Sequence, residues 1–509
     1  MKNNIKKAAV AVLACSFVLG ACSPKGGEEK GKKGGKEKHL VVANQVGVKE
    51  LDPHKDWNAW TLYRLGGIET LFKLDKDMNI TPSIAKGYKN IDPKNWEVEL
   101  REDVKFSNGE KVTAKKIIES LKRSIELNPS LAELKGTEFK DEGNKIVITT
   151  KEPNATLINN LCDPFTSIID VENTKDFKNK PIATGPYKIE SFAPDMEVKL
   201  VKNENYSGEE KPKLDSVTEK VIKESSTMVN ALKSGEVNAA INISFEGVKE
   251  LKGTQDFNIE QRLSSRGYFA YFHENIMKQK GLGQAITAAI NKETIAKDLL
   301  LHTVTATVTP LPKGYGFGEE SVKGQTFNLA DVEKILTDMG YKKGAKYFEK
   351  DGKTLDLKQM FYPRLSMKSI SLELQSQMQK AGINATANEI ATWEYLKRGE
   401  YEMGMYASIM LPTGDPYTFL ERTFGTGGSA NYNKYSNKEV DGKLKALKQE
   451  FDINKRKELV KEIQQLIVND YAHVFIGHTM INTVSKKNIK NLNLTPQEYT
   501  FLDAKIDME

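Results

Sequence analysis

The chain has 509 residues, 39% of them hydrophobic and 28% charged, with 75 basic against 69 acidic side chains. This composition is typical of a soluble globular protein of about three domains, and it excludes a multi-span membrane protein and a disordered chain. The formal net charge of +6 comes from the first 38 residues, because residues 39–509 contain 66 bases and 66 acids. Net charge therefore does not support a nucleic-acid-binding face, and no nucleic-acid partner is expected.

The first 21 residues are predicted to be a signal peptide. Three lysines precede an apolar stretch over 8–20, which is shorter than the ~20 residues that a membrane-spanning helix needs. The stretch leads into Leu-Gly-Ala-Cys at 19–22, which resembles the lipobox of bacterial lipoproteins. That resemblance implies that Cys22 becomes the first mature residue and carries a lipid. An ordinary signal with an incidental cysteine is the alternative.

Residues 22–38 are predicted to be the lipidated cysteine and a flexible basic tether, because they are rich in Gly and Lys and have nothing to bury. A lipid and a basic segment together give two membrane signals. The expected localisation is extracytoplasmic, anchored by lipid to the cell membrane on the cell surface or periplasmic side. Only Cys162 remains in the body, which excludes an intrachain disulfide there and indicates a small packed residue.

The body shows both strand and helix periodicity. Short apolar or alternating stretches predict strands over 40–43, 96–100, 146–148, 196–200, 237–241 and 472–476. Apolar stripes predict helices after a Thr113 cap, over 226–234 before Gly235, over 285–301, over 367–381 before Gly382, from Val440 to Phe451, and after an Asp452 cap. The elements alternate irregularly, so the class is mixed α/β with more than one sheet.

The body contains no motif that indicates catalysis. His273-Glu274 begins like H-E-x-x-H, but Met277 occupies the position of the second His. With six His and no Cys cluster, a protein-built zinc site is not expected. There is also no G-x-S-x-G elbow and no G-x-G-x-x-G after a strand. We therefore expect no catalytic residue, no metal-ligand set and no cofactor.

Six blocks in the body are similar, in sequence and in order, to motifs of the peptide/nickel class of extracytoplasmic solute-binding proteins. Each block alone is weak, but the ordered set is specific and runs from about residue 39 to the C-terminus. The blocks are Glu69–Leu71 with Pro82–Ala85, Leu100–Gly109 with Thr113-Ala114, Thr184–Tyr187 with Asn203–Tyr206, Leu232–Asn238, Gln284–Lys292, and Asp415-Pro416 with Phe419-Leu420.

The resemblance implies an α/β fold of the type II periplasmic-binding-protein kind, with three domains and two lobes that close over a ligand cleft by a hinge. Domain I is expected to be discontinuous, over 39–72, 183–266 and 482–509. Domain II is expected over 73–182 and domain III over 267–481.

The resemblance also implies a cleft lined by aromatic and polar side chains. Trp57 and Trp60 fall in a segment that borders the cleft in relatives, with a core position as the alternative. Arg64 and Arg364 could bind a ligand carboxylate bidentately, with a surface salt bridge as the alternative for Arg64. The predicted ligand-binding set is completed by Met410, Asp415, Asn431 and Tyr432.

Two departures from the family's pockets leave the ligand open. Di- and oligopeptide-binding relatives hold the α-amine of the peptide with an Asp in a W-x-x-D segment, where this chain has Pro412. Nickel-binding relatives also lack that Asp, but they place an Arg in the region of residues 161–168 and a His after the helix that follows the D-P pair. This chain has Asp163-Pro164-Phe165 in the first place and no His over 425–432.

The resemblance implies a receptor of an ABC importer that binds short peptides and delivers them to a membrane permease with a separate ATPase. Binding of a nickel chelate or another metallophore complex is the alternative within the class. A secreted peptide hydrolase and a peptide sensor without transport are alternatives from other classes. We expect a monomer whose partners are a small solute, the permease and, through the lipid, the membrane.

Overall fold

The computed structural model describes residues 37–317 and 319–509, and Lys38–Glu509 forms one compact unit. The predicted signal peptide, Cys22 and nearly all of the predicted tether lie outside the described residues. Among the residues that are described, no helix is long and apolar enough to cross a bilayer.

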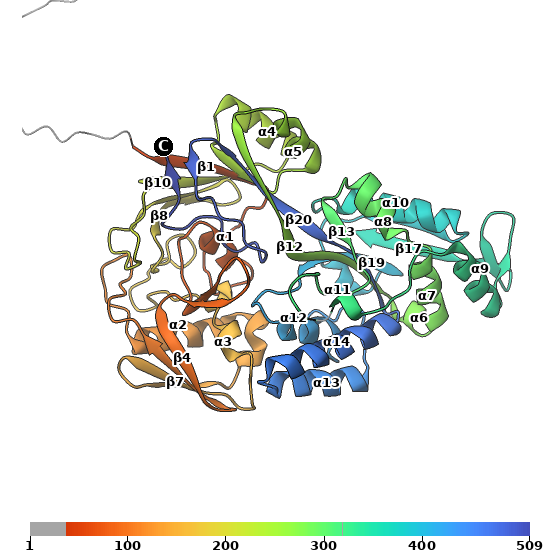
Figure 1. Cartoon of the computed structure of the whole chain (residues 1–509), viewed down its shortest axis with the longest axis horizontal. Helices are drawn as coiled ribbons and strands as arrows, with labels where there is room; N and C mark the ends of the chain where they lie inside the picture. The colour runs from red at the N-terminus through yellow and green to blue at the C-terminus, as the bar shows by residue number, and fades with distance from the viewer. Residues whose placement is uncertain (1–36, 318) are drawn as a thin grey trace, which may run out of the picture. The chain divides into compact units, whose positions relative to one another are not determined.

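An eleven-stranded sheet runs through the described body, and two of its strands are much longer than the rest. The long antiparallel pair is β12 (Phe257–Phe272) and β20 (His473–Lys486), which Figure 1 shows side by side in green and dark blue. The sheet order is β18 (Asn384–Glu389), β17 (Asp356–Phe361), β19 (Met403–Ile409), β12, β20, β11 (Ala239–Ile241), β1 (His39–Asn44), β10 (Ser216–Val221), β9 (Glu197–Lys202) and β8 (Tyr187–Ala193), with β13 (Val304–Ala306) paired to β20.

The pairing of β12 with β20 is irregular in the middle. Register shifts fall between Leu263 and Gly267 and between Tyr268 and Phe269. Bulges of this kind bend a strand and turn side chains to new directions. The predicted bounds of domains I and III cut these two strands close to the first shift. The body is nevertheless a single compact unit, so the three-domain division stays a prediction.

A second sheet has the order β4 (Ala85–Asp92), β5 (Asn95–Leu100), β7 (Lys145–Thr149), β6 (Glu138–Asp141). Helix α2 (Ala114–Leu127) lies next to it and buries Ile117 and Leu121. Thr113 caps this helix as predicted, because its side chain accepts a hydrogen bond from the backbone N–H of Lys116.

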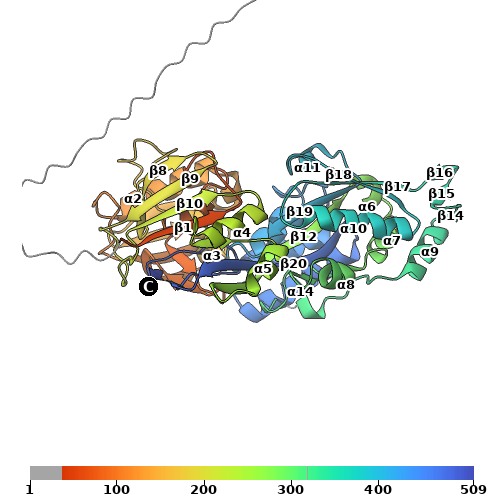
Figure 2. The same cartoon turned by 90° about the horizontal axis from the view of Figure 1, so that it is seen from above.

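Several predicted helix ends are confirmed. Helix α4 (Ser225–Ser234) ends at Gly235 with φ 82°, and α10 (Met367–Lys380) is followed by Gly382 with φ 85°. Both glycines occupy the left-handed conformation that ends helices. Helix α10 packs on β17 and β18 (Figure 2). The other elements are α1 (Ala59–Arg64), α3 (Leu157–Asn160), α5 (Phe245–Lys252), α6 (Glu274–Met277), α9 (Leu329–Asp338), α11 (Tyr395–Arg398), α12 (Tyr417–Phe424), the short 3-10 turns η1 (Pro129–Leu134), η2 (Pro164–Thr166) and η4 (Glu319–Ser321), β2 (Phe72–Leu74), β3 (Ile80–Pro82), β14 (Lys342–Lys343), β15 (Phe348–Lys350), β16 (Lys353–Thr354), β21 (Ile489–Lys490) and β22 (Asp507–Met508).

The single helix predicted over 285–301 is wrong. The structure has α7 (Lys280–Ala288), then α8 (Lys292–Thr294) and a π-helical turn η3 (Ile295–Leu299). Asn291 breaks the helix with ψ 89°, and its side chain accepts a hydrogen bond from the backbone N–H of Thr294. Asn competes for backbone groups in this way, so an Asn inside an apolar stripe can start a new helix.

The last two predicted helices are α13 (Lys438–Gln449) and α14 (Ile453–Asn469). Asp452 caps α14, because its Oδ1 accepts from the backbone N–H groups of Asn454 and Lys455. Phe451 lies beyond the end of α13 and is exposed, although the stripe predicted it on the apolar face. Its ring centroid instead lies 6.0 Å from that of Trp96.

Gly185 is expected to tolerate no side chain. A Cβ atom there would lie against the carbonyl group of Gly66 and 2.5 Å from the carbonyl carbon of Gly67, and backbone atoms cannot rotate away. Gly185→Ala should therefore lower the free energy of unfolding by about 1–3 kcal/mol, measured by urea unfolding. The control is Gly253→Ala, because a Cβ atom at Gly253 meets nothing within 4 Å. Equal urea midpoints for the two variants would contradict the prediction.

Candidate functional site

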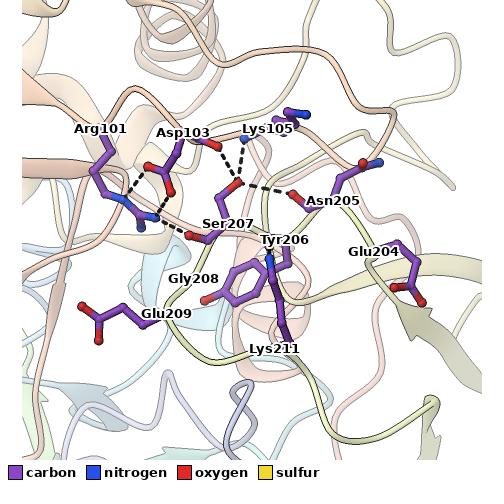
Figure 3. Close-up of a pocket in the computed structure, with 10 residues that line it drawn as sticks. All are labelled: Arg101, Asp103, Lys105, Glu204, Asn205, Tyr206, Ser207, Gly208, Glu209 and Lys211. Carbon is purple, nitrogen blue, oxygen red and sulfur yellow. Dashed lines mark hydrogen bonds and ion pairs between the residues drawn. The ribbon is translucent and has the colours of Figure 1, made fainter.

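A surface hollow of ≈ 430 Å³ has polar groups that bind one another (Figure 3). The Arg101 guanidinium pairs with Asp103 at 2.8 Å and also donates to the Ser207 carbonyl. The Ser207 hydroxyl donates to the Asp103 carbonyl at 2.8 Å and accepts from the Lys105 backbone N–H at 3.1 Å. None of the predicted ligand-binding residues lines this hollow. We therefore place the candidate site elsewhere.

The predicted tryptophans belong to a cluster of rings at the start of α1. The ring centroids of Trp57 and Trp60 are 4.8 Å apart, and Phe165 in η2 stacks on Trp60 at 6.0 Å. The ring centroid of Tyr499 lies 5.3 Å from that of Trp60. The Trp57 side chain is 40% exposed. The buried Trp60 Nε1–H has no hydrogen-bond partner among the described residues, so it is a free donor at this aromatic surface.

Arg64 is buried beside these rings, and it forms no surface salt bridge within the part of the chain that the structure describes. Its guanidinium carbon lies 5.6 Å from the Trp60 ring centroid, and its Nε donates to the backbone carbonyl of Glu498 at 2.7 Å. No carboxylate of the described chain lies within 4.0 Å of the guanidinium. Burial lowers the pKa of Arg64.

Glu498 is an acid that pairs with Arg266 and whose charge also acts on Arg64. Its carboxylate accepts a 2.9 Å ion pair from Arg266 of β12 and a 2.7 Å hydrogen bond from the Ser264 hydroxyl. Burial alone would raise the pKa of Glu498, but Arg266 and Arg64 outweigh burial and hold it at about 2. Burial alone would lower the pKa of Arg266, and the charge of Glu498 raises it instead.

Arg364 adds a further cation, for which the described residues supply no ion-pair partner. It follows β17, and its buried Nε–H has no hydrogen-bond partner among the described residues. Repulsion by Arg266 and then burial lower the pKa of Arg364. Arg64, Arg266 and Arg364 thus share the single charge of Glu498. Glu219 also acts on Arg64, but burial raises the pKa of that carboxyl to about 7. The cluster therefore has an excess of positive charge.

Tyrosines and a tryptophan form a second aromatic wall next to Arg364. The ring centroid of Tyr406 lies 6.3 Å from Tyr362 and 5.9 Å from Tyr432. Trp393 lies 5.7 Å from Tyr432. This wall comes from β19, from the loops after β17 and α12, and from the residues before α11. The predicted residue Tyr432 is thus part of the wall.

Arg422 connects the two walls electrostatically. It lies on α12, is half-buried, and donates from Nε to the Ser429 hydroxyl at 3.3 Å. Its charge acts on Tyr406 and Tyr432 in the second wall and on Tyr499 in the first. Sequence reasoning did not identify Arg422.

Three predicted residues are engaged in structural contacts. Asp415 pairs with Arg456 at 2.5 Å and accepts from the Tyr417 backbone N–H at 2.8 Å. Asn431 donates to the carbonyls of Gly425 and Tyr435 and accepts from the Tyr435 backbone N–H, which holds the loop together. Met410 is buried, and its Cε and Sδ fill the space beside Gly267.

Three hydrogen bonds join the part of the chain around η1 and α3 to the part around α12 and α13. The Asn159 side chain donates to the Thr413 carbonyl at 2.9 Å, and the Thr418 hydroxyl donates to Glu133 at 3.1 Å. The Ala155 backbone N–H donates to the Lys448 carbonyl at 2.8 Å. These hydrogen bonds join residues 133–159 to residues 413–448, which lie far apart in the chain.

The candidate site is therefore the set Trp57, Trp60, Arg64, Arg364, Arg422, Tyr406, Tyr432 and Tyr499. It offers flat apolar surfaces, free N–H donors and surplus positive charge, which suit a ligand with a carboxylate. No group of three His, Cys, Asp or Glu side chains that could hold a metal ion occurs in the described part of the chain. No local sequence pattern indicates Arg266 or Glu498, because their contact joins positions 232 residues apart.

Comparison with known proteins places the chain among solute-binding proteins. Residues 79–431 match the profile described as bacterial extracellular solute-binding proteins, family 5 middle. The nickel-binding protein NikA of Staphylococcus aureus is 24% identical over 477 residues, which cover 93% of this chain and 94% of that protein. The oligopeptide-binding protein AppA of Bacillus subtilis is 24% identical, with 84% and 83% covered.

Solved structures agree on the fold. The crystal structure of S. aureus NikA in complex with Ni(L-His)2 has a TM-score of 0.82 at 23% identity, covering 93% of this chain and 100% of that one. The structure of B. subtilis AppA with a nonapeptide has a TM-score of 0.79 at 20% identity, covering 93% and 99%. The fold is thus the expected mixed α/β fold of type II periplasmic binding proteins. The chain belongs to family 5 of the bacterial extracellular solute-binding proteins.

Proposed function

We propose that this chain is the ligand-capturing receptor of an ABC importer and that its ligand is a short peptide bound at the candidate site. The observation that carries the proposal is the buried Nε–H of Arg364, which lacks a partner within a cluster that has surplus positive charge. A carboxylate would satisfy this donor and balance the charge. The aromatic walls would then hold the rest of the peptide by stacking and apolar contact.

A nickel chelate is the second candidate, and the similarity to NikA favours it. Since no metal-binding group of side chains is found in the described residues, the metal would have to arrive already chelated. The carboxylates of the chelator would then meet the same arginines. The same experiment separates the two ligands.

The test is native mass spectrometry with elemental analysis of the full chain as purified. We expect a bound peptide mass and no metal. Stoichiometric nickel would overturn the peptide ligand and support the chelate. Cleavage of added peptides by the purified protein would overturn the receptor function and support a hydrolase.

We also propose that the protein is monomeric and lipid-anchored through Cys22, and that it delivers its ligand to a permease with a separate ATPase. The lipobox-like residues 19–22 and the basic segment after them support the anchor. The intact mass of protein extracted from membranes tests the anchor, and an unmodified N-terminus would contradict it.

A further inference from the structure

Asp163 is a buried carboxylate for which the described chain supplies no counter-charge. It lies directly before η2, is 6% exposed, and accepts one hydrogen bond through Oδ1 from the Phe165 backbone N–H at 3.0 Å. No Lys, Arg or His nitrogen of the described chain lies within 4.0 Å of the carboxylate, and Oδ2 has no hydrogen-bond partner there. Buried carboxylates normally have such partners because desolvation of an unpaired charge is costly.

Capping of the turn η2 does not explain why position 163 has a charged side chain. Capping the three-residue turn η2 needs one side-chain oxygen, and Ser or Asn caps a turn as well as Asp does. Burial raises the pKa of Asp163 to about 6, against which Arg422 acts only from a distance. The unpaired carboxylate therefore destabilises the folded protein.

Asp163 lies two residues before Phe165, which is part of the first aromatic wall of the candidate site. Its neighbour Phe165 contacts both tryptophans of the first wall, at 5.3 Å from Trp57 and 6.0 Å from Trp60. The Tyr499 hydroxyl experiences the charges of Asp163, Arg266, Arg64 and Arg422 together. One negative group thus lies within electrostatic reach of the same tyrosine as three arginines.

We infer that Asp163 is the anchor for a ligand ammonium group, so that the ligand is a zwitterion with both a free ammonium and a free carboxylate. The inference rests on the proposed function and narrows its ligand class to peptides with an unmodified N-terminus. The ammonium pairs with Asp163 while the carboxylate meets Arg364. An amino-acid chelate of nickel lacks this ammonium, because its amine nitrogen donates its lone pair to the metal.

The experiment compares the wild-type chain with Asp163→Asn, a substitution that keeps the shape and the cap of the turn. Each ligand-stripped protein is incubated with an equimolar library of tri- to pentapeptides, and separately with the same library after N-acetylation. Captured peptides are identified and their dissociation constants measured by native mass spectrometry and calorimetry. Asp176→Asn, at an exposed turn position, is the matched control, and urea unfolding checks that all variants are folded.

We expect the wild type and the Asp176→Asn control to capture unmodified peptides and to reject the acetylated ones. Asp163→Asn should bind the same unmodified peptides about 30-fold or more weakly, the effect of removing one partner of a buried charge pair. Equal binding by Asp163→Asn and wild type, or equal binding of acetylated and free peptides, would overturn the ammonium anchor while leaving a peptide receptor intact. A wild type that captures no peptide but binds Ni(II) with L-histidine would instead overturn the proposed peptide ligand, and the anchor with it.

Discussion

Replacing Glu498 by glutamine is expected to lower the free energy of unfolding by about 3–5 kcal/mol. The substitution removes the carboxylate that pairs with Arg266 and whose charge also acts on Arg64 and Arg364. Three buried or half-buried cations then repel one another with no anion between them. The Ser264 hydroxyl also loses a charged acceptor. Urea unfolding followed by circular dichroism measures the change.

The matched control is Glu142→Gln, which breaks an exposed ion pair to Lys140 of nearly the same length, 2.8 Å. Solvent screens that pair, so its urea midpoint should stay at the wild-type value. The double variant Arg266→Gln with Glu498→Gln should be more stable than Glu498→Gln alone, because one unpaired cation leaves with its partner. A Glu498→Gln midpoint equal to that of the control would show that the arginines do not depend on this carboxylate.

The same pair makes stability depend on pH in a defined window. The pKa of Glu498 is about 2 in the fold against an ordinary value of 4.5, so its contribution is complete above pH 4.5 and disappears as the pH falls towards 2. The difference corresponds to about 3 kcal/mol. Wild type and Glu498→Gln should therefore differ most at neutral pH and converge in urea midpoint below pH 4.5. A gap that stays constant down to pH 3 would contradict the low pKa.

Buried histidines also make stability depend on pH, in a pH range above that of Glu498. Their effect is the same in wild type and in Glu498→Gln. Burial lowers the pKa of His54 and His478 to about 4 and that of His473 to about 3, from 6.5. The unfolded chain therefore binds more protons than the fold between those values and 6.5, and these three groups make stability fall as the pH falls through that range. Their effect leaves the difference between wild type and variant unchanged.

The sequence predicted local structure well where a single residue type decides it. Thr113, Gly235 and Asp452 act through their own side chains or backbone freedom, so their roles can be read without the rest of the fold. The helix over 285–301 was wrong because an apolar stripe outweighed the cap signal of Asn291. Phe451 was misplaced because its contact is with Trp96, more than 350 residues earlier in the chain.

The candidate site is harder to predict from the sequence than the helix ends, because contacts between residues far apart in the chain determine its balance of charge. Trp57, Trp60, Arg64 and Arg364 stood out by residue type, and the fold brings Arg364 to within electrostatic reach of Arg64. Asp415 was identified by its motif, yet that motif serves the buried pair with Arg456. The sequence pattern assigns no role to Asp163. Asp163 is of interest because its carboxylate has no cationic partner among the described residues, and this can be seen only in the three-dimensional structure.

Arg364→Gln is expected to weaken ligand binding by about 100-fold while leaving the ligand-free protein at least as stable as wild type. The buried Nε–H has no partner among the described residues, and repulsion from Arg266 lowers the pKa of Arg364. Without ligand, removing this cation relieves repulsion and raises the urea midpoint. With ligand, it removes a charge-assisted pair to a carboxylate, a loss of about 3 kcal/mol. The opposite signs distinguish a binding residue from a structural one.

The measurement uses the peptides that the wild type retains, with calorimetry for affinity and urea unfolding for stability. Arg398→Gln is the matched control, because Arg398 is 49% exposed and lies 3.4 Å from Glu400 at the surface. The control should match wild type in both readouts. Amidation of the peptide C-terminus should weaken binding to wild type by a similar factor and make no further difference to Arg364→Gln, since the two changes remove the same contact. Unchanged affinity in Arg364→Gln, or additive losses with the amidated peptide, would place the ligand carboxylate at another cation, of which Arg422 is the first to test.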